Sequence, residues 1–216
     1  SRGSYPVERS ARSVSPRGQP CEENRSHQAA INNMFNKIRT IWYILKYQYI
    51  LKKATFGSNT LIKCKLEIKG SGKVTIGSGC SFEPDLWGDD HVTLYTHRPK
   101  ARIVIGNNVT LRATRFGCHL SILIENNAIL EYSSIFDTDY HNLDATKRDE
   151  IKEGGFNEGD RPVVIGEGSY VGCESLCSKG TCLGKNVILL PGTVIGTKKI
   201  ADNSVISGNP GRIIKK

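Results

Sequence analysis

The sequence predicts an all-β fold, a parallel β-helix preceded by one α-helix, and three observations lead to this prediction. Apolar residues occupy every sixth position of the C-terminal part, namely Ile165, Val171, Cys177, Leu183, Leu189 and Ile195. Four positions after each of the first five comes a small or β-branched residue: Ser169, Ser175, Thr181, Val187 and Thr193. Three positions after each of the same five apolar residues comes a residue of a type that mostly tolerates positive φ: Gly168, Glu174, Gly180, Asn186 and Gly192.

This period of six residues excludes the common alternatives. An amphipathic helix needs apolar positions three and four residues apart, and hairpin sheets place their turns less regularly. A period of six instead indicates a short strand followed by a corner. Three such sides close a coil, and each coil hydrogen-bonds to its neighbours about 4.8 Å away.

The elements follow in order along the chain. Residues 1–33 are rich in Ser, Arg and Pro and lack periodicity, so we expect a disordered leader or an expression scar. Residues 34–56 are expected to form a basic amphipathic helix. Its apolar stripe consists of Phe35, Ile38, Ile41, Trp42, Leu45 and Tyr49. Two roles remain open for this helix: a cap on the first coil, or an interfacial helix on anionic lipid.

Charge is distributed unevenly over this chain, whose formal net charge is +9. Residues 34–66 carry seven Lys and Arg residues and no acid, whereas residues 67–216 carry 18 basic and 18 acidic residues. The β-helix is therefore neutral, and nothing in it predicts a nucleic-acid partner. The seven cysteines show no zinc-like spacing, and we expect them to be small packing residues in a reducing cytosol.

The coils are expected to extend over residues 57–216, with two interruptions of the repeat. The segments 85–100 and 137–161 are expected to be loops. Insertions in solenoids map to one face, often the binding face. We therefore expect the functional residues in these two loops.

The repeat also carries a family resemblance. The segments 165–172 (IGEGSYVG) and 206–214 (ISGNPGRII) resemble those of hexapeptide-repeat acyltransferases of the polysaccharide or sugar O-acetyltransferase type. The resemblance covers about residues 57–216 and implies a left-handed β-helix. Left-handedness comes from the resemblance alone, because general chirality favours right-handed crossovers.

The resemblance also implies a catalytic residue in the loop 137–161. In the family, a histidine at this place removes a proton from the acceptor, and the matching residue here is His141. Imidazole suits this task because it titrates near neutrality. Asp139 is the first candidate to orient the ring, and Asp144 is the second. Backbone amides near Gly172 and Cys173 are candidates for stabilising the oxyanion.

Three residues of the two loops are expected to bind the acceptor: Trp87, Asp144 and Arg148. The acyl donor implied by the resemblance is acetyl-CoA, held between two subunits of a homotrimer without a metal. The family's donor contacts carry over to Cys173, Pro191, Thr197, Lys198 and Arg212. Tyr170 departs from the family pattern, which usually has tryptophan there.

The sequence thus predicts a cytoplasmic, acetyl-CoA-dependent O-acetyltransferase that acts on a saccharide hydroxyl and contacts the inner leaflet of the membrane. The acceptor would be a unit of a capsule, O-antigen or exopolysaccharide, or its precursor. Alternatives are N-acetylation of an amino sugar, a non-catalytic assembly subunit, and a metal-dependent hydratase on the same fold. The hydratase is disfavoured because no His-x4-His pair is present.

Overall fold

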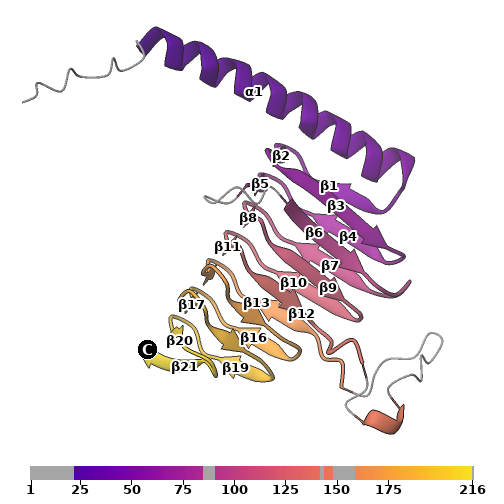
Figure 1. Cartoon of the computed structure of the whole chain (residues 1–216), viewed down its shortest axis with the longest axis vertical. Coiled ribbons are helices and arrows are strands. Elements are labelled where there is room, and N and C mark those ends of the chain that lie inside the picture. The colour runs from indigo at the N-terminus through magenta and orange to yellow at the C-terminus, as the bar shows by residue number, and fades with distance from the viewer. Residues whose placement is uncertain (1–21, 85–90, 142–143, 148–158, 216) are drawn as a thin grey trace, which may run out of the picture. The chain divides into compact units, whose positions relative to one another are not determined.

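The computed structural model describes residues 22–84, 91–141, 144–147 and 159–215. Residues 1–34 and 35–216 form separate compact units. Helix α1 (Glu22–Ile44) passes from the first unit into the second and continues as a short π-helical segment, η1 (Leu45–Ile50). All described strands belong to the second unit, where successive coils stack from β1 to β21 (Figure 1).

The strands form three sheets, and each complete coil contributes one strand to each sheet. Sheet A contains β1 (Ala54–Phe56), β4 (Lys73–Ile76), β7 (Arg102–Ile105), β10 (Ser121–Ile124), β13 (Val163–Ile165), β16 (Thr181–Leu183) and β19 (Lys198–Ile200). Sheet B contains β2 (Leu61–Ile62), β5 (Ser81–Glu83), β8 (Thr110–Arg112), β11 (Ile129–Glu131), β14 (Tyr170–Val171), β17 (Ile188–Leu189), β20 (Val205–Ser207) and β21 (Arg212–Lys215). Sheet C contains β3 (Lys65–Gly70), β6 (His91–Thr96), β9 (Arg115–Cys118), β12 (Ser134–Phe136), β15 (Leu176–Cys177) and β18 (Val194–Ile195).

The six-residue period produces the register between coils. Ile165 pairs with Leu183, and Val171 pairs with Leu189, in parallel ladders of sheets A and B. In sheet C, Cys177 pairs with Ile195. All six apolar positions of the period are at most 3% exposed, so they form the core along the inside of the coils. Among the strand pairs of the described residues, only the final one, β20 with β21, is antiparallel.

The corners adopt the backbone conformation that the sequence predicts. The five expected positions all have positive φ, between 54° and 74°: Gly168, Glu174, Gly180, Asn186 and Gly192. The residue after each is buried, and Ser169 shows why small polar residues occur there. Its hydroxyl accepts a hydrogen bond from Val187 N (3.0 Å) and donates one to Gly184 O (3.0 Å). These side chains therefore replace backbone partners at the corners.

The end of the helix covers the first coil with one face only. Tyr43 and Tyr47 are at most 9% exposed, and the Tyr47 hydroxyl donates to Leu66 O (3.1 Å). The Thr40 hydroxyl accepts a hydrogen bond from Ile62 N (2.8 Å), and the Arg39 guanidinium donates to Lys63 O. The predicted apolar stripe does not cover the coil, because all six of its residues are 48–61% exposed.

Two boundaries differ from the sequence prediction. The helix begins at Glu22 rather than at residue 34, and it ends before β1, which lies inside the segment expected to be helical. Part of the expected loop 85–100 is strand β6, which pairs with β3 over six residues. Its alternation of buried Val92, Leu94 and Thr96 is a strand pattern of period two, which a search for the six-residue repeat overlooks.

Candidate active site

The loop after β12 leaves the β-helix at the corner where the strands of sheet C turn toward sheet A, here called the C–A corner. Among the described residues between Phe136 and Val163, the one element of regular structure is a 3₁₀ turn, η2 (Ala145–Lys147). His141 is exposed, and its amide donates to Asp139 O (2.8 Å). The preceding residue, Tyr140, has a φ of 65°, which makes the turn tight. The His141 imidazole is therefore presented at the surface by a defined turn.

No hydrogen bond or ion pair joins Asp139 to the ring of His141. Its carboxylate forms an ion pair with the ammonium of Lys179, in the C–A corner turn of the next coil. The backbone carbonyl of Lys179 accepts hydrogen bonds from the amide (2.8 Å) and the hydroxyl (3.1 Å) of Thr197, one coil further. Asp139 thus links the loop to the same corner of the two following coils.

Of the expected acceptor-binding residues, only Asp144 lies within the described part of the chain. Its carboxylate accepts hydrogen bonds from the amide (2.9 Å) and the hydroxyl (2.7 Å) of Thr146. These bonds lower the pKa of Asp144, first through the Thr146 hydroxyl. Asp144 therefore caps η2. Trp87 and Arg148 lie outside the described residues.

A second group of polar side chains lies around His119, at the two described ends of the loop. His119 follows β9, and its side chain is only 8% exposed. Its Nδ1 atom lies 3.1 Å from Asp160 Oδ2 and 3.1 Å from the Thr138 hydroxyl. Arg98 also lies near Asp160, with 3.7 Å between Nη2 and Oδ2. In the sequence, only the run of Asp and Thr residues at 137–139 pointed to a polar group here. No sequence pattern around Asp160 indicated that it belongs to the group.

Aromatic rings enclose this group. The ring of His97 lies 5.0 Å from those of His119 and Tyr140, edge-on to both. Burial lowers the pKa of His97 to about 4, with further lowering by His119 and Arg98. His97 is therefore neutral near pH 7. Burial likewise raises the pKa of Tyr140 to about 12, so its phenol stays protonated.

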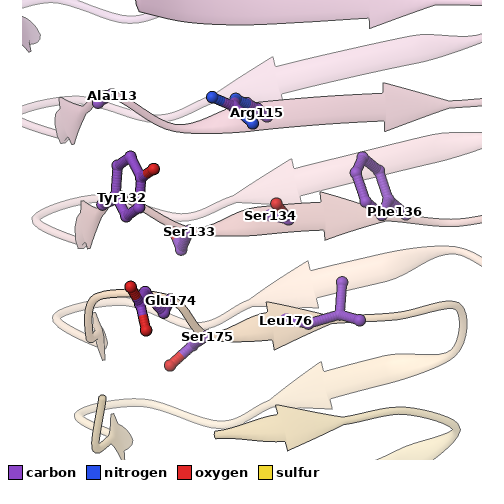
Figure 2. Close-up of a pocket in the computed structure, with 9 residues that line it drawn as sticks. All are labelled: Ala113, Arg115, Tyr132, Ser133, Ser134, Phe136, Glu174, Ser175 and Leu176. Carbon is purple, nitrogen blue, oxygen red and sulfur yellow. The ribbon is translucent and has the colours of Figure 1, made fainter. Parts of the chain in front are cut away.

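A surface hollow of about 230 Å³ lies on the outer face of sheet C, beside the corner where sheet B turns into sheet C (the B–C corner). Figure 2 shows Ala113, Tyr132 and Glu174 at the same turn of three successive coils. The hollow is also lined by Arg115, Ser133, Ser134, Phe136, Ser175 and Leu176. The lining of the hollow therefore contains aromatic rings, charged side chains and hydroxyl groups. Because Phe136 ends β12, the hollow lies on the strand that leads into the His141 loop.

The expected donor contacts lie at two corners. Cys173 and Pro191 precede β15 and β18 at the B–C corner, whereas Thr197 and Lys198 follow β18 at the C–A corner. Arg212 begins β21. Lys198 and Arg212 are exposed, and among the described residues neither forms an ion pair, so both suit anionic phosphates. The amide of Gly172 already donates to Leu189 O (3.0 Å), so it does not suit an oxyanion.

Comparison with known proteins shows the fold class. No family model matches the sequence. One similar solved structure, 18% identical in sequence, is a serine-to-cysteine mutant of AntD, an N-acyltransferase from Bacillus cereus, in complex with dTDP-4-amino-4,6-dideoxyglucose and coenzyme A. The match covers 78% of this chain and 88% of that one, with a TM-score of 0.52. A maltose O-acetyltransferase from Clostridium difficile 630 is 23% identical over 90% of this chain and 86% of that one, with a TM-score of 0.49. The fold is a left-handed parallel β-helix with one N-terminal α-helix.

Proposed function

We propose that this protein is an acetyl-CoA-dependent O-acetyltransferase that modifies a saccharide hydroxyl, with His141 as the general base. The observation that carries the proposal is the exposed His141, held in a tight turn at the C–A corner of this fold. The similar fold of AntD, which binds a sugar nucleotide and coenzyme A, supports this substrate class. The exposed cations Lys198 and Arg212 support an anionic donor.

The proposed reaction needs a base because a sugar hydroxyl is too weakly acidic to ionise alone. His141 takes the hydroxyl proton while the oxygen attacks the thioester carbonyl. The new C–O bond forms, the C–S bond breaks, and the proton passes to the departing thiolate. Acetyl-CoA and the saccharide thus give CoA and an acetyl ester. Asp139 acts at the loop rather than on the ring, because its carboxylate binds Lys179.

N-acylation of an amino sugar is the second candidate, because AntD is an N-acyltransferase with an amino sugar bound. Thiol release from acetyl-CoA, measured with neutral sugars and with amino sugars, separates the candidates. Mass spectrometry of the product should show the gain of one acetyl group. Lability of that group to mild base identifies an ester, whereas an amide is stable. The proposal fails if no sugar of either class releases thiol.

We expect the active protein to be a homotrimer. The hollow on sheet C and the C–A corner are both open on one chain, and an adjacent copy would convert them into an enclosed cleft. Light scattering should then give three times the chain mass of 23.8 kDa. A fully active monomer would contradict this expectation.

The protein is also proposed to bind an anionic membrane surface through the exposed face of its helix. Trp42 and Ile38 are 54% and 56% exposed, while Tyr43 and Tyr47 on the opposite face are buried. Such a contiguous apolar face marks an interaction surface. The basic stretch 34–66 favours anionic lipid over a neutral partner. Within the described residues, no helix combines the length and the hydropathy required to cross a membrane.

Vesicle binding tests this membrane proposal. The protein should sediment with phosphatidylglycerol vesicles at low salt and be released as salt rises, because the attraction is partly electrostatic. Ile38→Ser combined with Trp42→Ser should weaken binding by about tenfold or more. The control is Ile129→Ser combined with Ile188→Ser, two exposed residues of sheet B (38% and 39%). If the unmodified protein ignores these vesicles at low salt, the helix serves only as a cap.

A further inference from the structure

The loop that carries His141 is fastened at both ends to one residue, His119. At the start of the loop, Asp137 Oδ1 accepts a hydrogen bond from the His119 amide (2.7 Å), and the Thr138 hydroxyl lies 3.1 Å from Nδ1 of His119. At the end of the loop, Asp160 Oδ2 lies 3.1 Å from the same Nδ1 atom. The amide of Arg161 also donates to Asp137 O (3.0 Å), which closes the neck of the loop.

The protonation of the His119 ring follows from these partners. A carboxylate can only accept hydrogen bonds, so a bare Nδ1 at 3.1 Å would set two lone pairs against each other. A proton on Nδ1 instead donates to Asp160 and leaves the Thr138 oxygen as a second, weaker acceptor. This assignment rests on the hydrogen-bond network. The ring thus joins two segments of chain that are 22 residues apart in sequence.

The connection continues from Thr138 to the turn. The Thr138 hydroxyl accepts a hydrogen bond from the amide of Tyr140 (2.9 Å), the residue directly before His141. Because Tyr140 has a φ of 65°, which is unfavourable for an aromatic residue, the turn needs such support. The path runs from the His119 ring through the Thr138 hydroxyl to the backbone that presents His141.

We propose that His119 is a positioning residue that holds the His141 turn in its catalytic conformation. This proposal rests on the proposed function, in which His141 is the base. His119 acts through Thr138 and Asp160, and its Nδ1–H is the essential group. Loss of that group removes the side-chain bonds to Thr138 and Asp160, while the backbone bonds to Asp137 remain. Misplacement of a catalytic group by about 1 Å costs up to about 10²-fold in rate.

Three substitutions at residue 119 test which ring nitrogen matters. In His119→Asn the amide nitrogen lies near the place of Nδ1, whereas in His119→Gln it lies near the place of Nε2. His119→Ala has neither. We expect His119→Ala and His119→Gln to lower kcat by about 10- to 100-fold without changing KM for acetyl-CoA. His119→Asn should remain within about threefold of the unmodified enzyme.

Hydrogen exchange gives a readout that does not depend on activity. Amides 137–141 should exchange about tenfold faster in His119→Ala and His119→Gln than in His119→Asn, since a hydrogen bond of the turn is lost. Thr138→Val against Thr138→Ser tests the same path should His119→Ala fail to fold. Unchanged exchange in all variants would overturn the proposal. So would faster exchange with an unchanged kcat. An active His141→Ala enzyme would instead overturn the base assignment, and exchange would still report on the loop.

Discussion

At the residue scale, the sequence predicted the corners more reliably than the active site. The residue types at Gly168 and Asn186 favour a left-handed backbone, and φ is positive at both. Such preferences are local, so a single position shows them. The contact between His119 and Asp160 joins residues 41 positions apart, and no local pattern reveals it. For the same reason, Asp139 looked like the partner of His141 but instead contacts Lys179.

Two glycines should separate the two reasons for glycine in this repeat. Gly192 has a φ of 71° and open space around it, so Gly192→Ala should cost only the conformational penalty, about 1–2 kcal/mol. Gly166 has no positive φ, but an added Cβ would lie 2.2 Å from the carbonyl oxygen of Gly184 in the next coil. Gly166→Ala should therefore force the coils apart and cost about 3 kcal/mol or more. Urea unfolding of both variants measures the difference. Equal losses would contradict this account.

At the element scale, the sequence predicted an amphipathic helix, but the face that packs on the first coil is not the predicted apolar stripe. The apolar stripe is real, but it is exposed, and the cap is made by Thr40, Tyr43 and Tyr47. The sequence shows which residues share a face, and not which face meets the coil. When a helix is apolar on two sides, the sequence cannot show which side packs on the coil and which side is exposed to bind a lipid surface.

Charged residues form a ladder across the strands of sheet B, and it gives a pH prediction. Glu83 accepts hydrogen bonds from Lys63 (2.8 Å) and Arg112 (3.0 Å). Burial raises the pKa of Glu83, but the bonds from Lys63, Ser81 and Arg112 outweigh it and lower the pKa from 4.5 to about 2. A lowered pKa means that this stabilisation is complete above about pH 4.5 and disappears as the pH falls toward 2.

Glu83→Gln should accordingly lower the melting temperature near pH 7 and have no effect near pH 2. Since the pair is partly exposed, we expect about 1 kcal/mol, or roughly 2–4 °C for a chain of this size. Glu174→Gln is the matched control, because Glu174 is in no ion pair among the described residues. If Glu83→Gln lowers the melting temperature by the same amount at pH 7 and pH 2, the proposed stabilisation by ionised Glu83 is wrong.

At the scale of the whole molecule, the repeat specified most of the β-helix, because each position of a coil stacks on the same position of the next coil. The pairing of Ile165 with Leu183 follows directly from the spacing. The early coils were harder to predict, because their strands are longer and their spacing is less regular, as in β3 and β6. The segment 137–161 interrupts the repeat, and the contacts of its described residues were not predictable from a broken pattern.

The central claim is that His141 is the base for acetyl transfer, and the turnover of His141→Ala tests it most directly. His91→Ala is the control, because His91 lies on β6 and pairs with Glu67 (3.3 Å), away from the C–A corner. With acetyl-CoA and an accepted sugar, His141→Ala should lose about 10²–10⁴-fold in kcat and keep its KM for acetyl-CoA. His91→Ala should keep near-normal turnover. Near-normal turnover of a folded His141→Ala enzyme would contradict the account.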